Sequence, residues 1–268
     1  MATTKSIRAE TAKGPASLRQ RVLHVDDQGD GFRLPANLFA QLTEKNMAQI
    51  IGGGMTPNLS TTLVVPGFTV TTGGTGDVTG YSTTGGLVMT LASDDNFDMT
   101  LDSVLAVTPT TGKWYGMVAR IQTSAVTGAG IKIGLTTGGG AAALPFGTNY
   151  TDVVAISKEI ADASVVGTCR GNSGTAAASS EFGDMVNDTE VEVGFAFYLH
   201  ATTPQGYWSY KTATAEKATI TAFTSSQLTQ VAAILTSPPT MYWTIHGTGV
   251  TATNPTITVT SFMAGGDR

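Results

Sequence analysis

The stretch "EVEVGFAFYLH", residues 190–200, alternates between two sets of side chains and decides the fold class. Every second residue from position 191 to position 199 is apolar, whereas the remaining residues of the stretch include two carboxylates, a tyrosine and a histidine. Such alternation is typical of a strand with one face in a core and the other face outward. We expect the apolar set to face inward, namely Val191, Val193, Phe195, Phe197 and Leu199. The outward set is then Glu190, Glu192, Tyr198 and His200.

Similar runs, separated by glycine-rich turns, continue along the chain. "IKIGL" at 131–135 and "MYWTI" at 241–245 repeat the same pattern. The 268 residues are 41% hydrophobic and only 13% charged, and they include 32 glycines. Threonine is also abundant, and its β-branched side chain suits a pleated surface, while glycine suits turns. The sequence predicts an all-β body over 51–268, folded as a two-sheet antiparallel sandwich of the jelly-roll or lectin-like type.

One run, "TGKWYGMVARIQ" at 111–122, carries apolar residues on both faces. Trp114 and Val118 share one face, and Tyr115, Met117 and nearby apolar residues share the other. A strand of this kind is covered by the core on one side and partly covered on the other. We expect Trp114 to fill the space between the two sheets. A ligand-stacking role for Tyr115 is the alternative use of this aromatic pair.

Two short helices interrupt the strand pattern. The first is expected at 35–46, where leucines recur on one helical face. The second is expected in "SSQLTQVAAILTSPP" at 225–239, where Ser225 or Ser226 caps the start and Pro238 ends the helix. Its expected buried face consists of Leu228, Val231 and Leu235.

The N-terminal part differs from the rest in pattern and in charge. Residues 1–33 show no sustained period, and we predict an extended arm that, with the helix at 35–46, makes up a segment over 1–50. Its first 21 residues contain Glu10 as their single acidic residue, although the whole chain has a net charge of −5. A basic arm on an acidic body favours contact with an anionic surface, and a merely solvated terminus is the alternative. The basic residues are Lys5, Arg8, Lys13, Arg19 and Arg21.

Cysteine content and hydropathy limit the compartment and the partners. Cys169 is the single cysteine, so no disulfide within the chain and no cysteine-based metal cluster can form. We expect a protein made in a reducing cytoplasm, because no secretory leader and no bilayer-spanning apolar run is present. The mild negative charge does not indicate nucleic acid. Neither a membrane nor a nucleic acid is therefore an expected partner.

No motif indicates a catalytic centre, and we expect a protein that is not an enzyme and needs no cofactor. The three histidines lack metal-ligand spacing. Glu190 and Glu192 share a strand face, but no aromatic-rich stretch adjoins them in the sequence as in a sugar-cleaving groove. "SDDNFD" at 93–98 gathers three carboxylates that could hold calcium, with a solvated turn as the favoured alternative. These carboxylates are Asp94, Asp95 and Asp98.

Several of these runs carry a family resemblance over roughly 110–215. "TGKWYGMVARIQ" followed by "GIKIGLTT", and the later "EVEVGFAFYLH" and "GYWSYK", resemble strands of concanavalin-like and SPRY-type sandwiches. The layout of a basic arm, a short helix and a Thr- and Gly-rich β-body resembles virion structural proteins of tailed bacteriophages. Those are capsid decoration (cement) or fibre proteins, and they commonly form trimers. This second resemblance rests on composition and layout, and it transfers no residue-level site.

The virion resemblance implies a non-enzymatic structural protein that is assembled in the host cytoplasm and resides in the virion. Its partners would be the major capsid protein or neighbouring virion subunits, and a homotrimer is the preferred oligomer. In that hypothesis the arm's basic residues pair with an acidic capsid surface. The apolar face of the first helix then docks on the body or forms a trimer contact, and it consists of Leu34, Leu38, Phe39 and Leu42.

The alternative is a carbohydrate- or receptor-binding body of a tail fibre. The loops at 94–98 and 138–150 would then face a glycan, together with exposed aromatic residues. The aromatic candidates are Tyr115, Tyr207 and Trp208. A polysaccharide-degrading enzyme is the third hypothesis, and the sequence offers no carboxylate motif for it.

Overall fold

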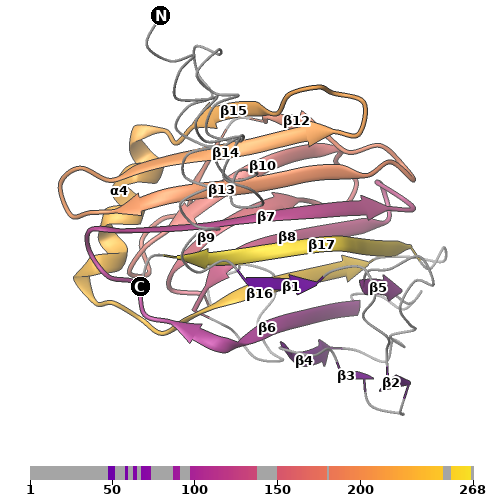
Figure 1. Ribbon diagram of the computed structural model, residues 1–268, viewed down its shortest axis with the longest axis horizontal. Helices are drawn as coiled ribbons and strands as arrows, with labels where there is room; N and C mark the ends of the chain where they lie inside the picture. Colours follow the sequence, from indigo (N-terminus) through magenta and orange to yellow (C-terminus); the bar gives the residue numbers. More distant parts are fainter. Residues whose placement is uncertain are drawn as a thin grey trace, which may run out of the picture.

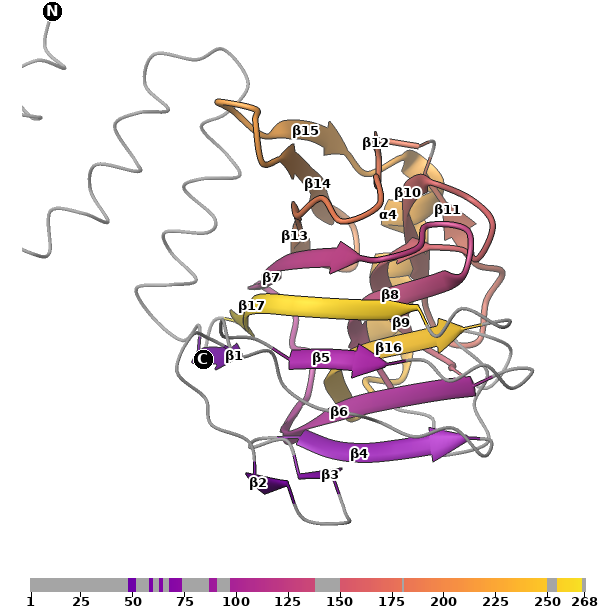
Figure 2. The same ribbon diagram turned by 90° about the vertical axis from the view of Figure 1, so that its right-hand side faces the viewer.

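Among the residues that it describes, the computed structural model places two antiparallel β-sheets face to face, with one short α-helix beside them (Figures 1 and 2). It describes residues 48–51, 58–59, 63–64, 68–73, 87–90, 97–137, 150–179, 181–249 and 255–266. Every pairing between the described strands is antiparallel. The prediction of an all-β, two-sheet antiparallel sandwich is therefore confirmed. The arm and the helix expected at 35–46 lie outside the described residues.

The first sheet, called sheet I, has seven strands, and the C-terminal strand lies between the N-terminal strand and the centre. Strand β5 (Leu87–Thr90) pairs with β17 beside the main order. The main order is β1 (Ala48–Ile51), β17 (Thr256–Gly266), β7 (Lys113–Thr123), β13 (Val191–Leu199), β14 (Gln205–Thr212) and β15 (Thr219–Ala222).

The second sheet, called sheet II, has eight strands. Strand β12 (Gly183–Asp184) pairs with β10 beside the main order, and β2 (Asn58–Leu59) and β3 (Leu63–Val64) form a separate pair. The main order is β11 (Ala177–Ala178), β10 (Ser164–Arg170), β9 (Val153–Lys158), β8 (Ala129–Thr136), β16 (Met241–Gly249), β6 (Phe97–Val107) and β4 (Phe68–Gly73).

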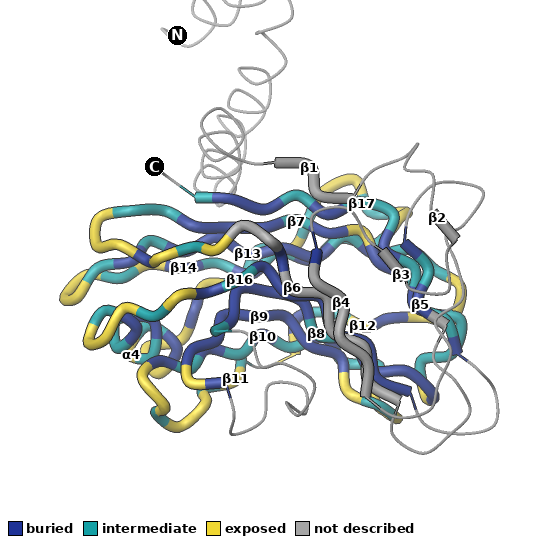
Figure 3. The backbone as a smooth tube through the Cα atoms, turned by 90° about the horizontal axis from the view of Figure 1, so that it is seen from below, coloured by how far each residue is buried: buried dark blue, intermediate teal, exposed yellow. Residues whose placement is uncertain are grey.

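The core lies between the sheets and consists of the apolar sets that alternation identifies. All five apolar residues of β13 are buried, as are the matching residues of β8 and β16. Figure 3 shows this burial along the strands, while the connecting loops are exposed. Trp243 of sheet II stacks on Phe195 of sheet I with ring centroids 6.2 Å apart, which joins the two sheets at the centre. The inward and outward sets predicted for 190–200 are confirmed.

The expectation for Trp114 is wrong, because its neighbour occupies the interior. Tyr115 is 4% exposed and stacks on Phe197 at 5.6 Å, whereas Trp114 is half-buried on the outer face against Tyr198. The two faces of β7 contain the residues that alternation assigns to them. Because both faces of β7 carry apolar residues, the sequence did not show which face is inward. The pairing of Tyr115 with the buried Phe197 on β13 shows that the Tyr115 face is inward.

Helix α4 (Ser225–Ala233) has its N-cap one residue before the first of the two expected cap positions. Thr224 is the N-cap and forms a reciprocal capping box with Gln227, which replaces the expected caps Ser225 and Ser226. A short 3₁₀ turn, η3 (Ile234–Thr236), follows, and α4 contacts β10 and β11. The buried side chains of this segment are Gln227, Val231 and Ile234, while Leu228 and Leu235 are partly buried against the core.

Gln227 is buried because its amide has partners in both sheets. Its Oε1 accepts from the Trp208 indole N–H at 3.3 Å, and its Nε2 donates to the Gly167 carbonyl at 3.0 Å. A buried amide stabilises a fold when its donors and acceptors are satisfied. Helix α4 is thereby fixed to β14 of sheet I and to β10 of sheet II.

Candidate functional site

The outward sides of the two sheets differ in their accessibility. At the centre of sheet II, Thr136, Thr244 and His246 are all buried, and the hydroxyls of Thr136 and Thr244 are hydrogen-bonded at 2.8 Å. On sheet I, the outward residues of β7, β13 and β14 include partly or fully exposed aromatic and charged side chains. A ligand can therefore reach sheet I directly, and its outer face is the candidate site.

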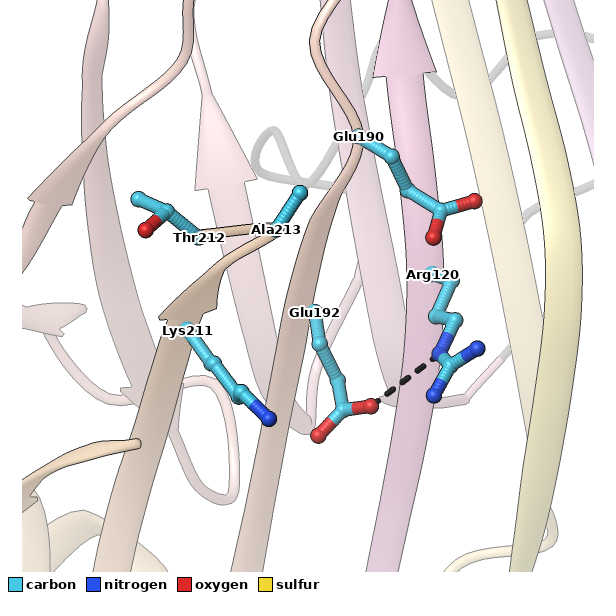
Figure 4. A pocket seen from close by; sticks show the side chains of 6 residues that line it. All are labelled: Arg120, Glu190, Glu192, Lys211, Thr212 and Ala213. Atoms are coloured by element: carbon cyan, nitrogen blue, oxygen red, sulfur yellow. Dashed lines mark hydrogen bonds and ion pairs between the residues drawn. The ribbon is translucent and has the colours of Figure 1, made fainter. Parts of the chain in front are cut away.

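One end of this face carries a row of alternating charge across three strands. Glu192 on β13 lies opposite Arg120 on β7 and opposite Lys211 on β14. The Arg120 Nε donates to Glu192 Oε2 at 3.1 Å (Figure 4). Cross-strand pairs of opposite charge stabilise a sheet by about 0.2–1 kcal/mol. Glu190, just before β13, accepts a hydrogen bond from the Thr260 hydroxyl at 2.5 Å.

These charged side chains surround an open hollow of about 170 Å³. Figure 4 shows Glu192 between the cationic ends of Lys211 and Arg120, with Glu190 above them in the view. Two cations and two carboxylates give the hollow no net charge. The lining residues are Arg120, Glu190, Glu192, Lys211, Thr212 and Ala213.

The other end of the outer face is aromatic. Trp114 and Tyr198 are opposite each other in the register, and their ring centroids are 5.1 Å apart. Tyr198 also stacks on His200, with centroids 5.9 Å apart and an interplanar angle of 8°. Trp114 and Tyr207 pack over Ala196, which is 1% exposed. The rings form a continuous surface across β7, β13 and β14.

The His200 ring is held in one orientation by the turn that follows it. Its Nδ1 accepts from the backbone N–H groups of Thr202 at 3.2 Å and Thr203 at 3.1 Å. His200 therefore extends the aromatic surface with its Nδ1 turned toward the backbone of the turn.

The glycan contacts predicted from sequence are partly corrected. Trp208 is 0% exposed and Tyr115 is 4% exposed, so neither ring can touch a glycan on the folded protein. Both lie on the inward faces of their strands, where they pack between the sheets. Tyr207 lies on the outer face and stays a prediction. Trp114 and Tyr198 also lie on this outer face. The alternation in "EVEVGFAFYLH" assigns Tyr198 to the outward set, so the sequence already indicated its position.

The other predicted contact residues lie outside the part of the chain whose side chains the structure describes. The loop at 138–149, Asp94 and Asp95 lie outside the described residues, and Asp98 lies in β6 without a described side chain. Within the part of the chain that the structure describes, no three His, Cys, Asp or Glu side chains gather into a metal site. The arm and first-helix residues also lie outside it, namely Lys5, Arg8, Lys13, Arg19, Arg21, Leu34, Leu38, Phe39 and Leu42.

Two side chains with reactive groups, Lys158 and Cys169, are buried and belong to the folded core rather than to the candidate site. The Lys158 amino group donates to the carbonyl of Val126, in the turn between β7 and β8, and to the carbonyl of Ala129, the first residue of β8. Burial lowers the pKa of Lys158 from 10.5 to about 8, and the carboxylates of Asp162 and Glu159 partly oppose this shift. Burial also raises the pKa of the Cys169 thiol, which keeps it protonated and unreactive. Among the described helices, none is long and apolar enough to span a membrane.

Comparisons with known proteins identify the fold. No protein-family model and no curated protein sequence matches the chain. Lectin II from Ulex europaeus superimposes with a TM-score of 0.54 and 12% identity, over 83% of this chain and 98% of the lectin. The lectin UEA-II complexed with galactose gives the same values, 0.54, 12%, 83% and 98%.

Two further solved structures are similar at lower identity. The Emp47p carbohydrate recognition domain has a TM-score of 0.50 at 8% identity, over 81% of this chain and 95% of that domain. Arcelin-5, a lectin-like defense protein from Phaseolus vulgaris, has a TM-score of 0.50 at 10% identity, over 75% of this chain and 92% of arcelin-5. At these identities the similarity concerns architecture. The chain has the two-sheet sandwich fold of these lectins.

Proposed function

We propose that this chain is a non-catalytic carbohydrate-binding protein and that the outer face of sheet I is its binding surface. The observation that carries the proposal is the joint presence of partly exposed rings and charged side chains on one accessible sheet face. The rings are Trp114, Tyr198 and Tyr207, and the charged row is Arg120, Glu192 and Lys211.

The two ends of the face match the two kinds of surface on a sugar. The C–H face of a pyranose ring is apolar and packs on aromatic side chains, whose buried area supplies much of the binding energy. Sugar hydroxyls both donate and accept, so they can bond to a guanidinium and to a carboxylate. Such hydrogen bonds to ionised groups are about twice as strong as those between neutral groups.

The surroundings of the two glutamates support binding rather than hydrolysis. Glycoside hydrolysis needs one protonated carboxyl and one carboxylate on opposite sides of the scissile bond. Glu192 forms an ion pair with Arg120, and Glu190 accepts a hydrogen bond from the Thr260 hydroxyl. Both belong to the same sheet face. The fold shared with a lectin complexed with galactose and with a carbohydrate recognition domain also supports binding.

A glycan array with the full-length chain tests this proposal. Tyr207→Ala should abolish binding to the glycans that the wild type selects, because it removes a ring from the outer face. Tyr242→Ala is the matched control, since Tyr242 is a half-buried tyrosine on sheet II. Equal loss in both variants, or no glycan bound by the wild type, would show that this face does not bind carbohydrate.

We further propose, from the charge distribution, that the chain acts in a tailed-phage virion. A basic arm on an acidic body favours docking on a capsid or on a neighbouring subunit, whose binding would add to shell stability by mass action. A decoration protein and a fibre protein can both carry a glycan-binding body. Quantitative mass spectrometry of the particle tests this proposal. Hundreds of copies indicate decoration, a few tens or fewer indicate a fibre, and absence of the chain refutes a virion role.

Deletion of residues 1–33 tests the docking mechanism separately. The truncated chain should lose binding to the particle, because the arm's basic residues are removed, and it should keep the glycan binding of sheet I. Substitution of Lys5, Arg8, Lys13, Arg19 and Arg21 by Gln is the more conservative variant. If particle binding is unchanged in both variants, the arm is not the docking element.

A further inference from the structure

The aromatic end and the charged end of the outer face lie on the same three strands. On β13, Tyr198 is opposite Trp114, and six residues earlier Glu192 is opposite Arg120. With a rise of about 3.3 Å per residue, the two ends are about 20 Å apart along the strand. This distance exceeds the reach of a single sugar ring, so a monosaccharide can contact one end but not both.

Between the two ends, the outward side chains of β13 are small. The outward positions of β13 there carry only Gly194 and Ala196. On β14 the facing residues are Ser209, opposite Gly194, and Tyr207, opposite Ala196. On β7 they are Val118 and Gly116. Because Trp114 and Tyr207 pack over Ala196, the small residue that separates these rings from the charged row on β13 is Gly194, and its neighbours on the adjacent strands are Val118 and Ser209.

The charged row favours a ligand without net charge. Glu192 accepts from Arg120 and lies opposite Lys211 in the register, so the cations already have an anionic neighbour. A carboxylated or sulfated sugar would be attracted by Arg120 and Lys211 and repelled by Glu192 and Glu190, so its charge gains no net attraction from the four side chains. A neutral sugar avoids this repulsion, and its hydroxyls can bond to both signs of charge.

We propose that the ligand is a linear, uncharged oligosaccharide that lies along β13 and contacts the aromatic and the charged end at once. This inference rests on the proposed carbohydrate binding and adds the length, the charge and the direction of the ligand. One end of the chain packs on the rings of Trp114, Tyr198 and Tyr207. The other end donates hydroxyl hydrogen bonds to Glu192 and accepts them from Arg120 and Lys211.

Calorimetric titration of the full-length chain with oligosaccharides of increasing length tests the inference. The probes are malto-, cello- and β1,4-galacto-oligosaccharides from the monosaccharide to the octasaccharide, with oligogalacturonides of equal length as the charged series. For the neutral series that binds, we expect the Kd to fall at least about tenfold between the disaccharide and the longest oligomers. The charged series should bind more weakly at every length.

Variants assign the gain in affinity to the charged end. Arg120→Gln together with Glu192→Gln should remove the gain in affinity that comes with ligand length. Arg120 is exposed, at 56%, and Glu192 is partly exposed, at 32%, so neither belongs to the core and the double variant should fold. Glu216→Gln, at an exposed position outside the face, is the matched control.

The outcomes separate this inference from the proposed function. A Kd that is constant from the monosaccharide upward, or a long-chain affinity that the double variant retains, overturns the extended binding mode and leaves carbohydrate binding in place. Stronger binding of oligogalacturonides overturns the requirement for an uncharged ligand. No binding of any series, together with a blank glycan array, overturns the inference and the proposed function together.

Discussion

Replacing Trp208 by alanine should remove a large part of the stability of the sandwich. The Trp208 ring is 0% exposed, stacks on Phe223 at 4.2 Å and lies parallel to Phe182 at 6.0 Å. It also lies against the backbone of Gly167, where an added Cβ would lie 2.2 Å from the ring. The ring therefore joins sheet I to sheet II at a point where both sides are close-packed.

The expected loss in the free energy of unfolding follows from the volume that the Trp208 side chain fills in the core. Truncating a buried aromatic side chain to alanine costs about 3–5 kcal/mol, because a cavity remains where the ring was. The lost hydrogen bond adds little, since the Gln227 Oε1 also accepts from the Thr224 backbone N–H at 2.9 Å and stays satisfied. We expect a loss of about 4 kcal/mol from a typical domain stability of about 5–15 kcal/mol.

Equilibrium unfolding in urea measures this loss. Trp114→Ala is the matched control, because it deletes the same side chain from the half-buried outer face, where no cavity is enclosed, and it should cost about 2 kcal/mol or less. Trp208→Phe should retain most of the stability, since a ring still fills the site. If Trp208→Ala costs no more than Trp114→Ala at equal m-values, packing of Trp208 between the sheets does not stabilise the fold as argued.

Three further predictions concern the core and its buried groups. Gly167→Ala should destabilise by about 1–3 kcal/mol in the same urea assay, because its Cβ would collide with the Trp208 ring, and a Gly167→Ala/Trp208→Leu double variant should cost less than the two single changes combined. The folded-state pKa of Lys158 is about 8, against an ordinary value of 10.5, so between these pH values the unfolded chain binds more protons and the free energy of unfolding should rise with pH, by a few kcal/mol at most. Lys158→Met should lack this rise when both chains are unfolded at pH 7 and at pH 10, and a rise of equal size in both would assign it to other groups. The Cys169 thiol should stay unmodified by a disulfide reagent in the native chain and react fully in urea, because it is buried and its pKa is raised, and rapid modification of the native chain would contradict the burial.

The candidate site was only partly visible in the sequence. Alternation placed Tyr198 and Glu192 together on the outward side of β13. It did not say which face of β14 points inward, because aromatic residues lie on both. Trp208 was therefore predicted as a surface ring, although it is a core residue.

The sequence also did not show which strands pair with each other. Arg120 and Glu192 are 72 positions apart, and only the pairing of β7 with β13 brings them to 3.1 Å. The same pairing places Trp114 beside Tyr198. No local pattern carries this information, because hydrogen bonding between backbones accepts many partners and registers.

The sequence by itself therefore determined the fold class, the inward set of β13 and the helix after β15. Those features depend on side-chain period and on capping chemistry, which act over a few neighbouring residues. Only the tertiary structure decided that Tyr115 and Trp208 are interior, that Trp114 is on the surface, and that rings and charges share one face. The period of a strand defines two faces, and burial against a second sheet selects between them.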